Sequence, residues 1–87
     1  MKDLNFKKLV EKELKKARTK HGKQASVHEG YAILLEEVDE FWEHVRSKSH
    51  LRNYEELLGE LVQIASCAQK TAEDVVIPKI NQRRRTR

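Results

Sequence analysis

The sequence predicts an all-α protein, a bundle of three main helices that is completed by oligomerisation. Three long segments carry apolar residues at helical spacing, and short polar connections separate them. The 87 residues form one domain, and a domain of this size buries only about 60% of the surface of its unfolded chain. This small core and a wide apolar stripe on the central helix favour a homodimer or homotetramer.

The first helix is expected from about Leu4 to Lys20, with Asp3 as its N-terminal cap. Its apolar positions repeat every three or four residues and are Phe6, Leu9, Val10, Leu14 and Ala17. Lysines occupy the opposite side and indicate an exposed, solubilising face. Gly22 ends the segment and begins a loop.

The central helix is expected from a cap at Ser26 to about Val45. Ser26 and Glu29 have the spacing of a capping box, in which each side chain accepts a hydrogen bond from a backbone N–H near the other. One face of the helix is apolar and consists of Tyr31, Leu34, Leu35, Val38, Phe41, Trp42 and Val45. Gly30 lies inside the helix, where glycine costs about 1 kcal/mol relative to alanine. We therefore expect another helix or a ligand to approach closely at Gly30.

A third helix is expected to begin after a cap at Asn53 and to end at Pro78, because proline lacks a backbone donor and restricts the preceding residue. Its apolar positions are Leu57, Leu61, Ile64, Ala65, Ala68, Ala72 and Val75. Residues 1–78 thus form the predicted helical domain. Residues 79–87 form a basic tail with four arginines, which we predict to be flexible.

The net charge of +4 conceals a strong segregation of charges. Residues 1–25 contain nine Lys or Arg and three acids, residues 26–63 contain three and nine, and residues 64–87 contain six and two. This layout either neutralises the acidic middle segment or surrounds a metal site with phosphate-binding cations. The basic ends alone would also suit nucleic-acid binding, a less favoured alternative that salt-dependent binding to mixed DNA or RNA would test.

Composition also argues against a membrane protein. No apolar run approaches the ~20 residues needed to span a bilayer. Cys67 is the single cysteine, so it forms no intrachain disulfide, and we expect a cytoplasmic protein. Cys67 itself is expected to be a packing residue and not a nucleophile.

Acidic residues gather on the other side of the central helix. Glu36 and Glu37 each lie about one turn before Glu40, which places their Cβ atoms about 5–6 Å from that of Glu40. On the third helix, Glu60 and Gln63 are three residues apart, so their side-chain oxygens can converge. If the two helices pack antiparallel, these groups share one pocket. Such oxygen donors suit Mg²⁺, whereas a solvated acidic face is the alternative interpretation.

The motif Glu36-Glu37-x-x-Glu40, followed after nineteen residues by Glu60-x-x-Gln63, resembles that of the all-α nucleoside triphosphate pyrophosphohydrolases of the MazG type. That family has Glu-Glu-x-x-Glu and then Glu-x-x-Asp, so Gln63 stands where the family has an aspartate. The resemblance covers residues 28–74, roughly half of the chain.

The resemblance implies a Mg²⁺-dependent enzyme, with Mn²⁺ as the alternative ion, that hydrolyses a nucleoside triphosphate to the monophosphate and pyrophosphate. It implies a metal site formed by Glu36, Glu37, Glu40, Glu60 and Gln63. Glu37 is a further ligand or the general base, and His28 and Lys70 are weaker candidates for contacts with the nucleotide. Because Gln63 supplies a dipole and no charge, the alternative is a weakly active or inactive binding or regulatory module of the same fold.

Overall fold

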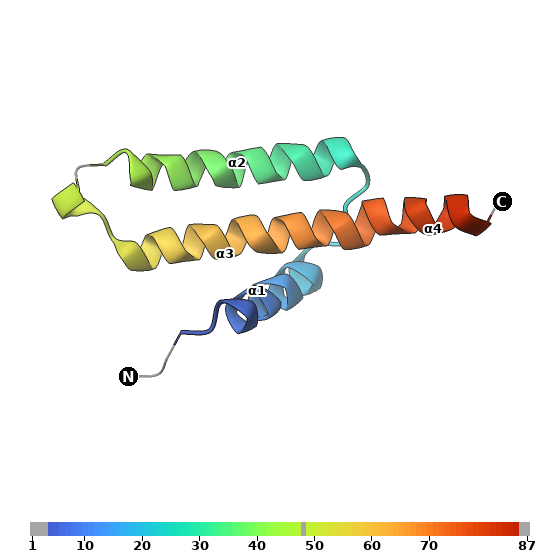
Figure 1. The fold of residues 1–87 in the computed structure, drawn as a ribbon, viewed down its shortest axis with the longest axis horizontal. Helices are drawn as coiled ribbons and strands as arrows, with labels where there is room; N and C mark the ends of the chain where they lie inside the picture. Colours follow the sequence, from blue (N-terminus) through green and yellow to red (C-terminus); the bar gives the residue numbers. More distant parts are fainter. Residues whose placement is uncertain (1–3, 48, 86–87) are drawn as a thin grey trace.

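The computed structural model describes residues 4–47 and 49–85. Within these ranges the chain forms helices and no strands: α1 (Phe6–Lys20), α2 (Val27–Val45), a 3₁₀ turn η1 (Ser49–Leu51), α3 (Tyr54–Thr71), a π-helical segment η2 (Ala72–Val76) and α4 (Ile77–Arg85). Helices α2 and α3 lie antiparallel, α1 packs against α3, and α4 continues the direction of α3 beyond the bundle (Figure 1). The prediction of an all-α fold with three main helices is confirmed.

Helix α1 is capped by Asn5, whose side-chain oxygen accepts a hydrogen bond from the backbone N–H of Lys8 at 3.1 Å. The sequence prediction placed the cap at Asp3, which lies outside the described residues, and the first helical residue at about Leu4. Asn5 has an extended backbone and satisfies a donor of the first turn. The helix therefore begins at Phe6.

The predicted caps of the other two main helices are confirmed. Ser26 Oγ accepts a hydrogen bond from the N–H of Glu29 at 3.1 Å, and Glu29 Oε1 accepts one from the N–H of Ala25 at 3.0 Å. Asn53 Oδ1 accepts from two backbone N–H groups in the first turn of α3. These caps satisfy donors that have no partner within the helix.

The core of a single copy is small. Its buried apolar residues are Val10, Leu14, Val62, Cys67 and Val75, which come from α1, α3 and η2. The predicted apolar stripe of α2 is divided between two environments. Leu34, Phe41 and Val45 are half-buried, whereas four other members of the stripe are exposed, namely Tyr31, Leu35, Val38 and Trp42. Much of the stripe is therefore left uncovered by the described parts of the same copy.

Gly30 is a position where α2 closely approaches its neighbours. A Cβ atom on Gly30 would lie 2.5 Å from Oγ1 and Cγ2 of Thr71 and 2.8 Å from Oε1 of Gln24. Thr71 Oγ1 also donates a hydrogen bond to Gln24 Oε1 at 2.6 Å. The predicted close approach is confirmed, and the partners of Gly30 are α3 and the loop between α1 and α2.

The predicted helix end at Pro78 is wrong. Helix α3 passes into η2 and then into α4, which contains Pro78 and continues beyond it. In a regular α-helix the proline ring would clash with the carbonyl group of Asp74, four residues earlier. In η2 the chain is wider, because the N–H of Ile77 bonds to the carbonyl of Ala72, five residues earlier. The wider turn makes room for the ring, so the helix is not broken. Whether residues 79–87 are flexible stays a prediction.

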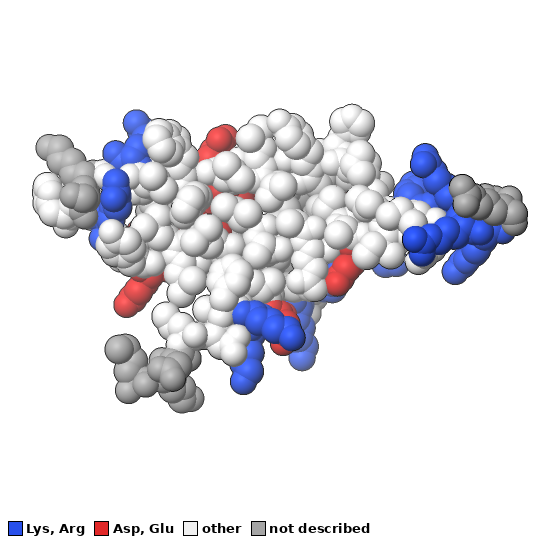
Figure 2. Space-filling model, in the orientation of Figure 1, with Lys and Arg blue, Asp and Glu red and all other residues white. Residues whose placement is uncertain are grey.

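The surface charges are distributed unevenly. Lys and Arg gather at the projecting end of α4 and beside α1, whereas the face over α2 and α3 is largely uncharged in Figure 2. None of the helices in the described part of the chain combines the length and apolar character that a membrane span requires.

Candidate metal centre and the adjoining cavity

Glu37 and Glu40 of α2 and Glu60 of α3 form a group that we call the carboxylate cluster. One oxygen from each side chain lies within 4.8 Å of the other two. The cluster arises because Glu37 and Glu40 are one turn apart on α2 and α3 packs antiparallel against that turn. The structure thus brings together three of the five residues that the sequence predicted as metal ligands.

The carboxylate cluster contains more negative charge than its surroundings balance. Partial burial, together with the charges of Glu40, Glu60 and Glu36, raises the pKa of Glu37 to about 7. Burial and the neighbouring Glu40 also raise the pKa of Glu60. Glu60 Oε2 is buried and has no hydrogen-bond partner among the described residues, which is a costly state for a carboxylate oxygen. A bound cation would offset the repulsion among the carboxylates and would give Glu60 Oε2 a partner.

His44 lies beside the cluster, on the turn of α2 after Glu40. Its Nε2 is 3.8 Å from Glu60 Oε1, and its Nδ1 is 3.4 Å from Glu56 Oε2. These distances are longer than those of good hydrogen bonds. His44 therefore does not supply the hydrogen bond that Glu60 lacks. Sequence analysis did not select His44, although its position four residues after Glu40 placed it near the acidic face.

The other two predicted ligands lie outside the carboxylate cluster. Glu36 is exposed. Gln63 uses its amide nitrogen to donate a short hydrogen bond to Glu13 of α1. Both side chains line a cavity that adjoins the cluster, as do Glu13 and Glu37. Glu13 is the residue of this group that sequence reasoning missed, because its contact depends on how α1 packs against α3.

The cavity has a volume of about 770 Å³ and lies between α1, the loop after it, α2 and α3. Its acidic lining consists of Glu13, Glu29, Glu36 and Glu37, and its basic lining includes Lys16, Lys20, Lys23 and Lys70. This volume is in the range of small-molecule sites, about 300–1,000 Å³. Glu37 belongs to both the cavity and the carboxylate cluster. Of the two weaker nucleotide-contact candidates, Lys70 lines the cavity, whereas His28 is exposed and outside its lining.

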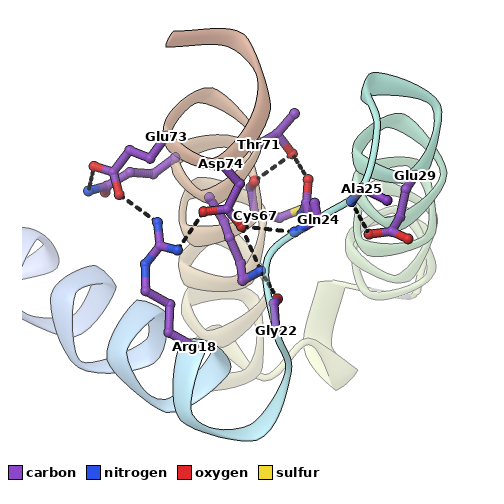
Figure 3. A network of polar contacts seen from close by, with 11 residues as sticks. Arg18, Gly22, Gln24, Ala25, Glu29, Cys67, Thr71, Glu73 and Asp74 are labelled. Carbon is purple, nitrogen blue, oxygen red and sulfur yellow. Dashed lines mark hydrogen bonds and ion pairs between the residues drawn. The ribbon is translucent and has the colours of Figure 1, made fainter. Parts of the chain in front are cut away.

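Asp74 of η2 is the centre of a group of contacts that we call the Asp74 network, which holds the loop wall of the cavity (Figure 3). Its members are Arg18, Gly22, Gln24, Lys70 and Asp74. Lys70 Nζ donates hydrogen bonds to Asp74 Oδ2 at 2.8 Å and to the carbonyl of Gly22 at 2.6 Å. Asp74 also accepts from Arg18 at 2.6 Å and from the N–H of Gln24 at 3.0 Å. Burial acts to raise the pKa of Asp74, but the hydrogen bonds outweigh it and hold that pKa well below its usual range.

The helical fold alone does not define a chemistry, which depends on these residues and their arrangement. No family model, curated protein or solved structure matches this chain in the comparisons.

Proposed function

We propose that the chain is a Mg²⁺-dependent nucleotide pyrophosphohydrolase of the MazG type, which hydrolyses a nucleoside triphosphate to the monophosphate and pyrophosphate. The observation that carries the proposal is the buried Glu60 Oε2, which has no partner among the described residues and belongs to a cluster of three carboxylates. A merely solvated acidic face would keep its carboxylates apart and hydrated. Here two helices bring them within 4.8 Å of one another.

The donor set suits a hard cation. Three carboxylates offer only oxygen atoms, which Mg²⁺ prefers and Mn²⁺ accepts, whereas softer metals favour sulfur and imidazole. Glu37, Glu40 and Glu60 would hold the ion, and Glu36 and Gln63 lie along the cavity beside them. When bound, Mg²⁺ would neutralise phosphate oxygens and lower the pKa of a water molecule.

Glu37 is the candidate general base. In the metal-free chain its pKa is raised to about 7, so a Glu37 carboxylate that the ion does not hold could accept and return a proton near neutral pH. Glu37 is also the member of the carboxylate cluster that lines the cavity. It can therefore face both the metal centre and a water molecule that attacks a phosphate.

The basic wall of the cavity suits a phosphate chain. Lys16, Lys20 and Lys23 are exposed and line the cavity, so their charges can meet phosphate oxygens without a prior partner being displaced from a buried site. Lys70 already donates to Asp74 and Gly22, so its first role is to hold the loop. A cavity lined by these lysines and joined through Glu37 to the carboxylate cluster fits a Mg²⁺-bound triphosphate.

We also propose that the active form is a homodimer or homotetramer. The exposed side chains of Tyr31, Leu35, Val38 and Trp42 follow one another at helical spacing along α2, and a continuous apolar face of this kind usually marks a contact surface.

Sedimentation at micromolar concentration is expected to show a dimer or tetramer, which Trp42→Glu shifts towards the monomer. Gln82→Glu adds the same charge on the exposed α4 and is the control. A folded monomer of the natural chain would contradict the proposal.

The metal function is tested by Glu40→Gln. We expect calorimetry to show that the natural chain binds Mg²⁺ and that the affinity of the variant is at least about tenfold lower. The reason is that a unit charge close to a divalent ion contributes several kcal/mol before desolvation. The fold should persist, since Glu40 is exposed and nothing apolar is lost. Asp39→Asn removes the same charge at an exposed neighbour outside the cluster.

Pyrophosphate release from a panel of nucleoside triphosphates is then measured on the same proteins. Turnover by the natural chain and the Asp39→Asn control, but not by Glu40→Gln, is the expected result. Unchanged Mg²⁺ binding in Glu40→Gln would refute the metal site. Metal binding by the natural chain without turnover of any nucleotide would favour the alternative of an inactive binding or regulatory module.

A further inference from the structure

One contact joins α1 directly to the turn of α3 that carries Glu60. Gln63 Nε2 donates a short hydrogen bond to Glu13 Oε1 across fifty residues of sequence. Both side chains are partly buried, and both line the cavity together with Glu37. Gln63 lies one turn after Glu60, so the two side chains share a face of α3. The contact therefore lies on the wall of the cavity that Glu37 of the carboxylate cluster also lines, although Glu13 is not a member of the cluster.

The chemistry of this contact depends on position 63 being an amide. An ionised carboxylate only accepts hydrogen bonds, whereas a glutamine amide has an accepting oxygen and a donating nitrogen. Glu13 therefore orients the amide of Gln63, because the nitrogen must face the carboxylate. The oxygen of Gln63 is then the end left for other contacts. A carboxylate at position 63 would face Glu13 with two acceptors, and the pair could bond only if one of them held a proton.

We propose that Glu13 is a positioning residue of the metal centre: it orients Gln63 and supplies, from α1, the negative charge that a carboxylate at position 63 would carry. The inference rests on the proposed metal function. It explains why glutamine is compatible with the site. Glu13 and Gln63 act as a pair of one carboxylate and one amide. The hydrogen bond between them can form whichever of the two positions carries the carboxylate.

A double-mutant cycle on Mg²⁺ affinity tests the pair. Glu13→Gln is expected to lower the Mg²⁺ association constant about threefold to tenfold, because the charge is lost while an amide pair can still form. Gln63→Glu alone is expected to gain less than about twofold, since the new carboxylate faces Glu13. The exchanged double variant, Glu13→Gln with Gln63→Glu, restores the hydrogen bond and the charge. We expect it to bind Mg²⁺ at least as tightly as the natural chain.

Two controls separate this role from general effects of charge and folding. Glu11→Gln removes the same charge from an exposed position of α1 outside the cavity lining and should leave Mg²⁺ affinity nearly unchanged. The thermal midpoint of the metal-free proteins at pH 8 should fall in Gln63→Glu and recover in the double variant. This second readout requires no metal.

The outcomes distinguish the two proposals. If the natural chain binds no Mg²⁺, the proposed function fails, and the positioning role fails with it. If the natural chain binds Mg²⁺ but Glu13→Gln changes nothing, or matches Glu11→Gln, only the positioning role is overturned. A double variant that binds Mg²⁺ more weakly than Glu13→Gln would also overturn it, because the exchange would then not restore the pair.

Discussion

The Asp74 network and the carboxylate cluster each contain an acidic side chain of the long helix that begins with α3, yet the charges of the two groups are balanced to different extents. The side chain of Asp74 is 2% exposed and receives hydrogen bonds from Lys70, Arg18 and a backbone N–H. In the carboxylate cluster, Glu60 has a buried oxygen without a partner among the described residues. Its neighbours are the carboxylates of Glu37 and Glu40 and, 3.8 Å from its Oε1, the Nε2 atom of His44.

The difference appears in the direction of the pKa shifts. The pKa of Asp74 is held low because burial is outweighed by hydrogen bonds from cations and a backbone donor. The pKa of Glu37 and that of Glu60 are raised by burial and by like charges. A carboxylate of the first kind is already paired by the fold. A carboxylate of the second kind is stabilised by binding a proton or a cation from outside, and raised pKa values of this origin are often found at functional sites.

The largest expected effect on the free energy of unfolding comes from breaking the Asp74 network. Asp74→Asn should lower the free energy of unfolding by about 3 kcal/mol, because the variant leaves the buried Lys70 without its counter-charge. Urea unfolding followed by circular dichroism measures the change. Glu43→Gln, which breaks an exposed ion pair with Arg46, should cost at most about 0.5 kcal/mol. Equal effects in the two variants would show that the Asp74 network contributes no more than a surface pair.

The close packing beside the Asp74 network predicts that a substitution of Gly30 has a smaller effect on the free energy of unfolding. Gly30→Ala should lower the free energy of unfolding by about 2 kcal/mol, since the new Cβ would lie 2.5 Å from Thr71 side-chain atoms. Gly59, which precedes Glu60, has open space around its Cβ position among the described residues. Gly59→Ala should therefore stabilise the chain by about 0.5–1 kcal/mol through helix propensity. Thermal unfolding of the two variants tests the contrast, and a stabilised Gly30→Ala would contradict it.

Sequence reasoning succeeded where the decisive interactions are local. The caps at Ser26 and Asn53 were predicted because a cap depends on residues within one turn, and the carboxylate cluster followed from helical spacing plus antiparallel packing. Glu13 was missed because its partner lies fifty residues away and no periodicity points to it. Pro78 was misjudged because proline usually ends a helix, and the wider turn of η2 that accommodates its ring was not predicted. The spacing of four residues between Lys70 and Asp74 was a usable signal for that pair. The packing of α1 and its loop onto the pair could not be predicted from spacing.

The two regions also predict opposite pH dependences for the stability of the metal-free chain. Asp74 has a lowered pKa in the folded state, so its contribution is present above its ordinary pKa of 3.8 and is lost as the pH falls through the lower folded value. Glu37 has a pKa raised from 4.5 to about 7. Between these two values the folded state keeps a proton that the unfolded chain has released, so stability falls as the pH rises. With respect to these two groups, the chain should be most stable between about pH 4 and 5.

Urea unfolding in the presence of a chelator at pH 5 and pH 8 measures this last and smallest effect. We expect a loss of about 1–2 kcal/mol between the two values, after allowance for the screening of a partly exposed carboxylate. Glu37→Gln should reduce the loss, because the group that holds the extra proton is gone. A loss that is equal in Glu37→Gln and the natural chain would assign the pH dependence to other groups. Under the proposed metal function, added Mg²⁺ should restore stability at pH 8 but much less at pH 5, because the ion would bind the ionised cluster and compete there with its protons.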